Sequence, residues 1–300
     1  GAVKGQRVPL DIWGAILATL GSTALVLGLT SAGKGASNPV FIVAMLVGIA
    51  SLGAFFITQK HTENGVLPLS LFTRRDRVFT FIAIFLLGAI MTTVAVFVAL
   101  YVQTILKYTT LRAGLAFIPF AFALALGAAT ASKISMKWAP RWIILAGCIF
   151  MVIGFGWGTA ISEESTFWAD IFPPTLIIGY GVGLVSIALT LSAVAGVKPI
   201  DVGPLTAISL VAQTLGGPIG LAFAGALAQS YTRHHGGADI PVTEMNSVQL
   251  HALGEGYLLT LFVCLGLAVV MGILSALFIR FTVPDVVEGQ KANEAANDLP

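Results

Sequence analysis

Two short motifs in this sequence are of residue types that can do chemistry: the pair His234–His235 and the run Gly179-Tyr-Gly-Val-Gly183. Imidazole rings bind metals, but no full set of further ligands accompanies this pair. Glycine-rich runs cradle phosphates where they join a strand to a helix, whereas this run lies inside an apolar segment with no strand before it. We therefore predict a solvated loop around the histidines, no metal, no nucleotide and no other cofactor.

Catalysis is also disfavoured, because no nucleophile and base fall together in a plausible cleft. The remaining candidates are uncharged. Gln213 lies in the middle of an apolar segment, where it can either contact a substrate in a central cavity or bond to a neighbouring helix. Phe117, Phe120 and Tyr180 can line the same apolar cavity or serve as ordinary packing residues. The sequence predicts no enzyme and leaves both roles open for these four residues.

A glycine- and proline-rich stretch gives the strongest local signal. Gly216 and Gly220 are four residues apart, so they share one face of a helix and allow a second backbone to approach closely. Gly217 and Pro218 lie between them, and proline removes a helical hydrogen bond and favours a bend. The stretch predicts either a gating helix or plain helix–helix packing.

The elements that carry these residues are long and apolar. Of the 300 residues, 57% are hydrophobic and only 10% are charged, against roughly 25% charged in a soluble domain. A helix needs about 20 mostly apolar residues to cross a bilayer. Eight stretches qualify, approximately Ile12–Leu29, Val40–Ile57, Val78–Ile105, Ala113–Ala131, Trp142–Ile161, Ile171–Val197, Val202–Ala228 and Tyr257–Phe281. The prediction is an all-α integral membrane protein with eight transmembrane helices.

The basic residues predict its orientation. Lys and Arg gather on the cytoplasmic side of short membrane loops. With Gly1 inside, 12 of the 16 Lys and Arg residues fall on inside segments. We therefore expect the start of the chain and the polar tail after Phe281 to be cytoplasmic, and the connection Gln229–Gly256 to be a polar outside loop. The scattered charges form no basic stripe, which disfavours nucleic acid as a partner.

Four phrases also resemble one family of membrane proteins. They are Leu111-Arg-Ala-Gly-Leu-Ala-Phe-Ile-Pro119, Pro140-Arg-Trp142, the run Gly179–Gly183, and Gln213-Thr-Leu-Gly-Gly-Pro-Ile-Gly220. In this order they resemble the major facilitator superfamily, and within it the fourteen-helix drug:proton antiporters of the QacA and EmrB type, including the EfpA-like pumps of actinobacteria. The resemblance covers essentially the whole chain.

The resemblance implies the C-terminal part of such an antiporter. Residues 1–77 would be two accessory helices and a basic inside loop, residues 78–281 the C-terminal six-helix bundle, and residues 282–300 a polar cytoplasmic tail. A further N-terminal six-helix half would precede Gly1. The implied function is proton-driven efflux of amphipathic or cationic drugs across the cell membrane by alternating access. Its partners would be the lipid bilayer, a small amphipathic substrate, protons and the missing half.

Further roles follow only from the resemblance. Lys133, Lys137 and Arg141 match a basic loop motif that, with Asp201, would latch the two halves together; plain positive-inside anchoring and helix capping by Asp201 remain alternatives. The glycine–proline stretch sits at the position symmetric to the antiporter motif of the first half. No predicted span carries a carboxylate or histidine near its middle. The resemblance implies that the coupling acids lie mainly in that first half.

Two other functions stay open. One is a lipid translocator of the same fold, since no anionic residue lies mid-span to select cations. The other is a membrane scaffold that does not transport, or a half that stands alone.

Overall fold

The computed structural model describes residues 12–31, 39–61, 74–160, 167–237 and 242–297. Within these ranges the chain is mostly helical, with short turns between the helices, and no strand occurs. It divides into two compact units, Gly1–Arg74 and Arg75–Pro300.

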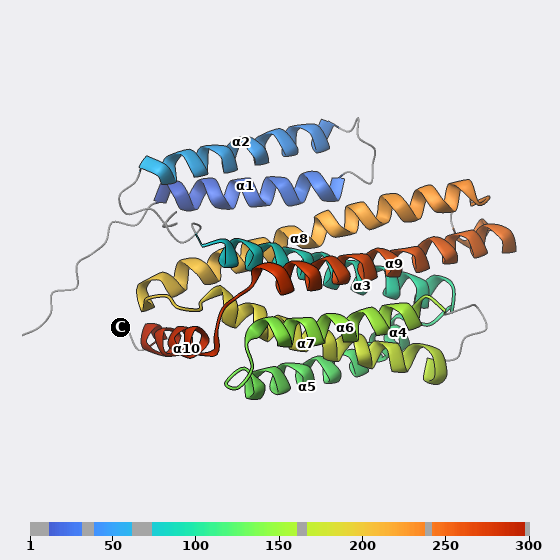
Figure 1. Ribbon diagram of the computed structural model, residues 1–300. Coiled ribbons are helices and arrows are strands. Elements are labelled where there is room, and N and C mark those ends of the chain that lie inside the picture. The colour runs from blue at the N-terminus through green and yellow to red at the C-terminus, as the bar shows by residue number, and fades with distance from the viewer. Residues whose placement is uncertain (1–11, 32–38, 62–73, 161–166, 238–241, 298–300) are drawn as a thin grey trace, which may run out of the picture. The chain divides into compact units, whose positions relative to one another are not determined.

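The first unit is a helical hairpin. Helices α1 (Ile12–Ser31) and α2 (Pro39–His61) lie side by side (Figure 1). Glycines make the contact, because an added Cβ at Gly21 would lie 2.8 Å from Leu52 and one at Gly48 would lie 2.7 Å from Leu25. The two helices occupy the positions predicted for the first two spans. Whether they cross a membrane stays a prediction.

The second unit is a helical bundle, and its described residues include six helical segments that are long and apolar enough to cross a membrane. They are α3 (Arg75–Thr104), α4 (Thr110–Ala116) with α5 (Ile118–Ile134), α6 (Pro140–Gly158), α7 (Phe172–Ala193), α8 (Pro199–His234) and α9 (Ser247–Phe278). The last six predicted spans each coincide with one of these segments. The span predicted as Ala113–Ala131 is divided at Phe117, because Pro119 at the start of α5 has no backbone N–H to donate and interrupts the helical hydrogen-bond pattern.

The surface of the bundle suits lipid. Large apolar side chains such as Phe122, Leu210 and Phe262 are more than half exposed. Tryptophans are also exposed near both ends of α6. Trp138 lies just before the helix, Trp142 lies in its first turn and Trp157 lies near its end. Tryptophan gathers at membrane–water interfaces. Apolar flanks with aromatic ends are the surface expected of membrane-spanning helices.

Glycines hold α8 against α3. An added Cβ at Gly216 would collide with the carbonyl of Phe85, and one at Gly220 would lie 2.5 Å from Ala89. In return, a Cβ at Gly88 would collide with the carbonyl of Gln213. The two helices run in the same direction with their backbones in direct contact. The predicted close approach at Gly216 and Gly220 is therefore present.

The run Gly179-Tyr-Gly-Val-Gly183 has the same purpose on α7. An added Cβ at Gly179 would lie 2.6 Å from the carbonyl oxygen of Phe120 on α5. An added Cβ at Gly183 would collide with the carbonyl oxygen of Leu124 on the same helix. Gly181 faces α6 instead, and an added Cβ there would lie 2.6 Å from the carbonyl oxygen of Gly147. Alternate glycines thus let α7 contact α5 on one side and α6 on the other.

Two regions differ from expectation. In its described residues, the predicted outside loop Gln229–Gly256 is largely helical, because α8 continues to His234, η4 (Val242–Glu244) is a 3₁₀ turn and α9 begins at Ser247. The polar tail contains a helix, α10 (Val283–Asn297), in which Val286 and Ala292 are buried. The polar residues of both regions suggested loops, because the local sequence does not show which side chains are buried against other helices.

The α10 helix and Arg77 hold the connection between α7 and α8. The Arg77 side chain is only 2% exposed and donates a hydrogen bond of 2.9 Å to the Ala195 carbonyl. The Gly196 amide donates to the Asp285 carbonyl at 2.9 Å, and Gly289 packs on the Val194 carbonyl. A basic residue counted as part of a loop is thus a buried structural contact at this end of the bundle.

The glycine contact between α3 and α8 can be tested by Gly216→Ala. The new methyl group must push α8 away from the Phe85 carbonyl, and overpacking of this kind costs roughly 1–3 kcal/mol. We expect the unfolding temperature of the detergent-purified protein to fall by several degrees. Gly203→Ala on the same helix is the matched control, because no atom lies within 4 Å of its added Cβ. Equal unfolding temperatures for the two variants would contradict the contact.

Candidate functional site

The residues predicted to line a substrate cavity do not meet at one place. Phe117 and Phe120 belong to the α4–α5 segment, Tyr180 to α7 and Gln213 to α8, and all four are half-buried. The Tyr180 ring packs edge-on against Phe150 of α6, with ring centroids 5.1 Å apart. None of the four lines either of the cavities described below. Their contact with substrate stays a prediction.

The glycine–proline stretch lies on the α3 side of α8. Gly216, Gly217 and Gly220 are buried, and an added Cβ at Gly217 would lie 2.5 Å from the Thr92 hydroxyl oxygen. The α8 helix continues through Pro218, which can donate no backbone hydrogen bond. This geometry provides the packing; a gating role is a separate proposal.

The predicted latch residues lie at the end of the bundle that carries α10. Lys133 and Lys137 are exposed, and the Arg141 guanidinium lies over the Trp142 ring, 5.1 Å from its centroid. Asp201 lies in the first turn of α8, where a carboxylate favours the positive end of the helix dipole. It is not the capping residue, because the helix begins at Pro199 and its N-cap is Lys198. In the described ranges, no ion pair joins Asp201 to the three basic residues.

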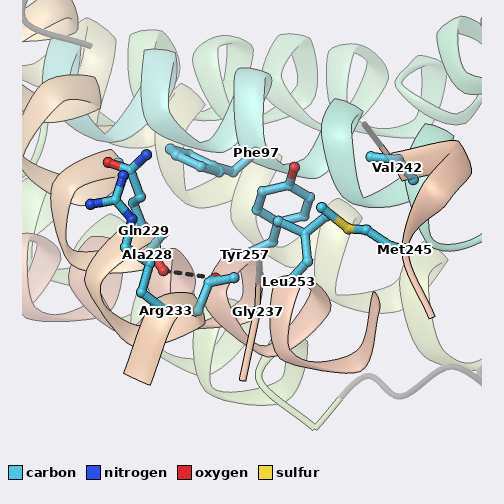
Figure 2. A pocket seen from close by; sticks show the side chains of 11 residues that line it. Phe97, Ala228, Gln229, Arg233, Gly237, Val242, Met245, Leu253 and Tyr257 are labelled. Atoms are coloured by element: carbon cyan, nitrogen blue, oxygen red, sulfur yellow. Dashed lines mark hydrogen bonds between the residues drawn. The ribbon is translucent and has the colours of Figure 1, made fainter. Parts of the chain in front are cut away.

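A cavity of about 300 Å³ lies at the opposite end, here called the α8–α9 end, where α8 finishes and α9 begins. Figure 2 shows its walls: Phe97 from α3, Gln229 and Arg233 from α8, Met245 after η4, and Leu253 and Tyr257 from α9. The Phe97 and Tyr257 rings are in contact, with centroids 5.8 Å apart and planes tilted by 54°. The cavity therefore has an aromatic floor and a polar rim.

The aromatic floor separates this cavity from a smaller one of about 30 Å³. Phe97 and Tyr257 line both spaces, and Tyr101, Ile171 and Leu261 also line the small one. The smaller space is almost wholly apolar. The two rings are thus a partition with room on each side.

Close packing of α8 on α9 forms the side of the cavity. The Thr232 hydroxyl donates to the Ala228 carbonyl at 2.9 Å, with the Ala252 carbonyl oxygen of α9 as a second acceptor at 3.3 Å. An added Cβ at Gly256 would collide with the Thr232 hydroxyl oxygen. Any residue but glycine at position 256 would therefore force α8 and α9 apart beside the cavity.

Polar side chains join the same two helices further out. The Tyr231 hydroxyl donates a 3.0 Å hydrogen bond to the Glu255 carboxylate, and the His251 ring lies 3.4 Å from the other carboxylate oxygen. His234 and His235 are exposed, and the His235 ring stacks on Tyr231 with centroids 3.9 Å apart. No group of three or more His, Cys, Asp and Glu side chains that could hold a metal occurs in the part of the chain that the structure describes.

The sequence offered one overlooked signal for this region. Asn246 and Gln249 form a capping box: the Asn246 side chain accepts from the Gln249 amide, and the Gln249 side chain accepts from the Asn246 amide, both at 2.9 Å. An Asn followed three residues later by Gln before an apolar run marks a helix start. It would have placed the polar residues from Ser247 onward on a helix instead of a loop.

Comparisons with known proteins give one consistent picture, although no family model matches the chain. EfpA of Mycobacterium tuberculosis, named an uncharacterised MFS-type transporter, is 38% identical over 292 residues, which are 97% of this chain and 55% of EfpA. The cephamycin export protein CmcT of Amycolatopsis lactamdurans is 31% identical over 72% of this chain and 45% of its own length. The chain thus spans about half the length of these relatives.

Solved structures agree on the fold. The crystal structure of a bacterial homologue of the human lysosomal transporter Spinster, in an inward-facing and occupied conformation, superposes with a TM-score of 0.58. It shares 16% of its residues with this chain and covers 91% of it, while the chain covers 67% of the homologue. The sequence relatives are named as transporters and not as enzymes. Together with this shared fold, they show that the chain belongs to the major facilitator superfamily.

Proposed function

We propose that this chain is the C-terminal portion of a secondary efflux transporter that exports amphipathic or cationic compounds from the cell. The observation that supports this most is the set of relatives: CmcT is named for cephamycin export, and a protein 25% identical over 231 residues is named for puromycin resistance in Streptomyces alboniger. Cephamycin and puromycin are both small organic molecules, a substrate class that fits the apolar helices of the bundle.

The exposed faces of the bundle support a partner half. The segments α4–α5 and α8 bury only 22% of their most apolar stretch within this chain, whereas α3 and α7 bury 56% and 61% of theirs. A six-helix N-terminal half, packed on α5 and α8, would cover these faces and enclose a central path. Alternating access would then be a rocking of the two halves about a site near the bilayer midplane.

Proton coupling would depend on that other half. Among the described residues, no Asp, Glu, His, Lys or Arg side chain lies in the middle of the six spans. A proton relay needs groups that change charge within the membrane. In this proposal residues 1–77 are accessory helices, and Gly1 and the tail after Phe281 are cytoplasmic. The α8–α9 end then faces the outside of the cell membrane.

Substrate class and energy source are tested together in proteoliposomes, with the protein expressed from its complete gene. We expect ethidium, a cationic dye, to be moved when a proton gradient is imposed, and the movement to stop when a protonophore is added. A fluorescent phospholipid is the second substrate. Movement of the lipid but not of ethidium would favour the lipid translocator, and movement of neither would favour a scaffold.

A gating role for the α8 glycines is tested by Gly217→Leu. The larger side chain meets Thr92 and hinders any movement of α8 along α3, so we expect transport to fall at least tenfold while the protein still inserts. Gly266→Leu on α9 is the control, since nothing lies within 4 Å of its added Cβ and the residue is exposed. Normal transport by Gly217→Leu would reduce the glycines to packing residues.

The latch is tested by Asp201→Lys. If Asp201 pairs with basic groups of the other half, reversal of its charge shifts the balance between inward-open and outward-open states. A single cysteine introduced at Ser230 reports that balance through its rate of maleimide labelling from outside. Glu288→Lys, at an exposed residue of α10, is the control, because it makes the same change of charge at the same end of the bundle. Identical labelling in wild type and Asp201→Lys would remove the latch.

A further inference from the structure

The turn between α5 and α6 combines basic and aromatic side chains at the end of the bundle that carries α10 (Figure 1). Lys137 and Trp138 lie in the turn itself, and Arg141 and Trp142 lie in the first turn of α6. Lys137 and both tryptophans are exposed. The amides of Lys137 and Trp138 donate to the Ile134 carbonyl at 2.9 and 2.8 Å. A hydrogen-bonded turn therefore holds these side chains where a membrane-spanning helix begins.

One face of α6 continues from this turn as a strip that suits lipid chains. Trp142, Ile149, Ile153 and Trp157 are each about half exposed, and their spacing places them on one face of the helix. The rest of α6 packs on α7 and α9. A rise of 1.5 Å per residue puts the two tryptophans about 22 Å apart, which covers most of a hydrocarbon core of roughly 30 Å. The other half proposed above packs on α5 and α8, so this face of α6 is left to lipid.

The sequence around the turn is positively charged. Residues 77–162, which include Lys137 and Arg141, contain no Asp or Glu. The helices packed on α6 are α7 and α9, and each is followed at this end by a basic residue, Lys198 and Arg280 respectively. The α10 helix, which carries acids, packs on α7 and α8. Basic residues close to a membrane surface attract acidic lipid headgroups.

The position of Arg141 favours contact with such a headgroup. Its guanidinium lies over the Trp142 ring, 5.1 Å from the ring centroid. Its Nε–H is buried and meets no hydrogen-bond acceptor among the described residues. A buried donor without an acceptor is unfavourable. A small shift of the side chain toward a phosphate oxygen would replace this unmet donor with a charge-assisted hydrogen bond.

From these observations we propose that an acidic phospholipid binds to α6, with its phosphate at Lys137 and Arg141 and an acyl chain along Ile149 and Ile153. The lipid is a bound partner of the bundle and not the transported compound. The proposal rests on the membrane embedding of α6, and it needs neither efflux activity nor the latch between the two halves. Plain anchoring by basic residues would instead attract acidic lipid to every positively charged part of the surface alike.

Local quenching by spin-labelled lipid tests the proposal. The protein, expressed from its complete gene, carries Ile149→Cys labelled with bimane and is held in phosphatidylcholine nanodiscs; protein without the added cysteine gives the background. A minor fraction of the lipid is phosphatidylglycerol or phosphatidylcholine with the same nitroxide on its chain. Half-maximal quenching should need at least about fivefold less of the phosphatidylglycerol, the attraction of a single basic residue for acidic lipid.

A second reporter position separates a local site from general attraction. Val270→Cys on α9 is exposed and lies a similar number of residues from the same end of the bundle. We expect the two lipids to quench bimane at this position within twofold of each other, because neither Lys137 nor Arg141 is near it in the sequence of helix faces exposed to lipid.

Two matched charge variants identify the headgroup contact. Lys137→Gln with Arg141→Gln should bring the two lipids within twofold of each other at Ile149→Cys, while quenching by phosphatidylcholine stays as in the parent. Lys107→Gln with Arg112→Gln also removes one lysine and one arginine, both exposed and at the opposite end of the bundle. This control should keep the preference. No gradient is imposed, so a failure of the proposed efflux leaves the result unaffected.

Three outcomes would overturn the proposal: equal quenching by the two lipids at Ile149→Cys, an equal preference at Val270→Cys, or an equal loss in both charge variants. Inorganic phosphate is a further check on the source of the anion. If it removes the preference when sodium chloride of the same ionic strength does not, a free anion is sufficient and the lipid site is excluded.

Discussion

Direct backbone contact at glycine is the constraint on which the bundle depends. Within a bilayer there is little hydrophobic gain from bringing two helices together, because lipid tails are as apolar as the side chains. Attraction has to come from close van der Waals packing, which falls away quickly as atoms separate. The absence of a Cβ at Gly88, Gly216 and Gly220 brings α3 and α8 together, and the three glycines of α7 do the same for α5 and α6. No polar bond is needed to define these interfaces.

The same contacts determine where the functional surfaces lie. While α8 uses its glycines to bind α3, large side chains elsewhere on the helix, such as Leu210 and Phe223, are left exposed in this chain. Beyond Gly220 the glycines become sparser, and α3 and α8 are separated by the Phe97 ring. The cavity opens at this point, and α9 closes it through Thr232 and Gly256. The cavity thus lies where the close packing of α3 on α8 ends.

Much of this architecture could be predicted from the sequence. Long apolar segments gave the positions of the helices, because burial in lipid needs no knowledge of partners, and the spacing of Gly216 and Gly220 indicated a helix contact. Other features depend on partners that are distant in the chain. Arg77 was assigned to a basic loop because nothing near it reveals the Ala195 carbonyl 118 residues later. The polar residues 229–256 were assigned to a loop because their burial against one another appears only once α8 and α9 are paired. For the same reason the cavity, which three helices build, had no local signal.

The position of the cavity on α8 has a consequence for the whole bundle. Gly220 touches Ala89 of α3, and Gly225, little more than one helical turn later, faces Phe97 of the same helix. A rigid helix cannot slide or rotate at Gly220 without also moving Gly225, Gln229 and Arg233. The shape of the cavity and the packing of α8 on α3 therefore change together. A ligand that prefers one cavity shape must favour the matching helix arrangement by its difference in affinity, and the helix arrangement must in turn alter the affinity by the same factor.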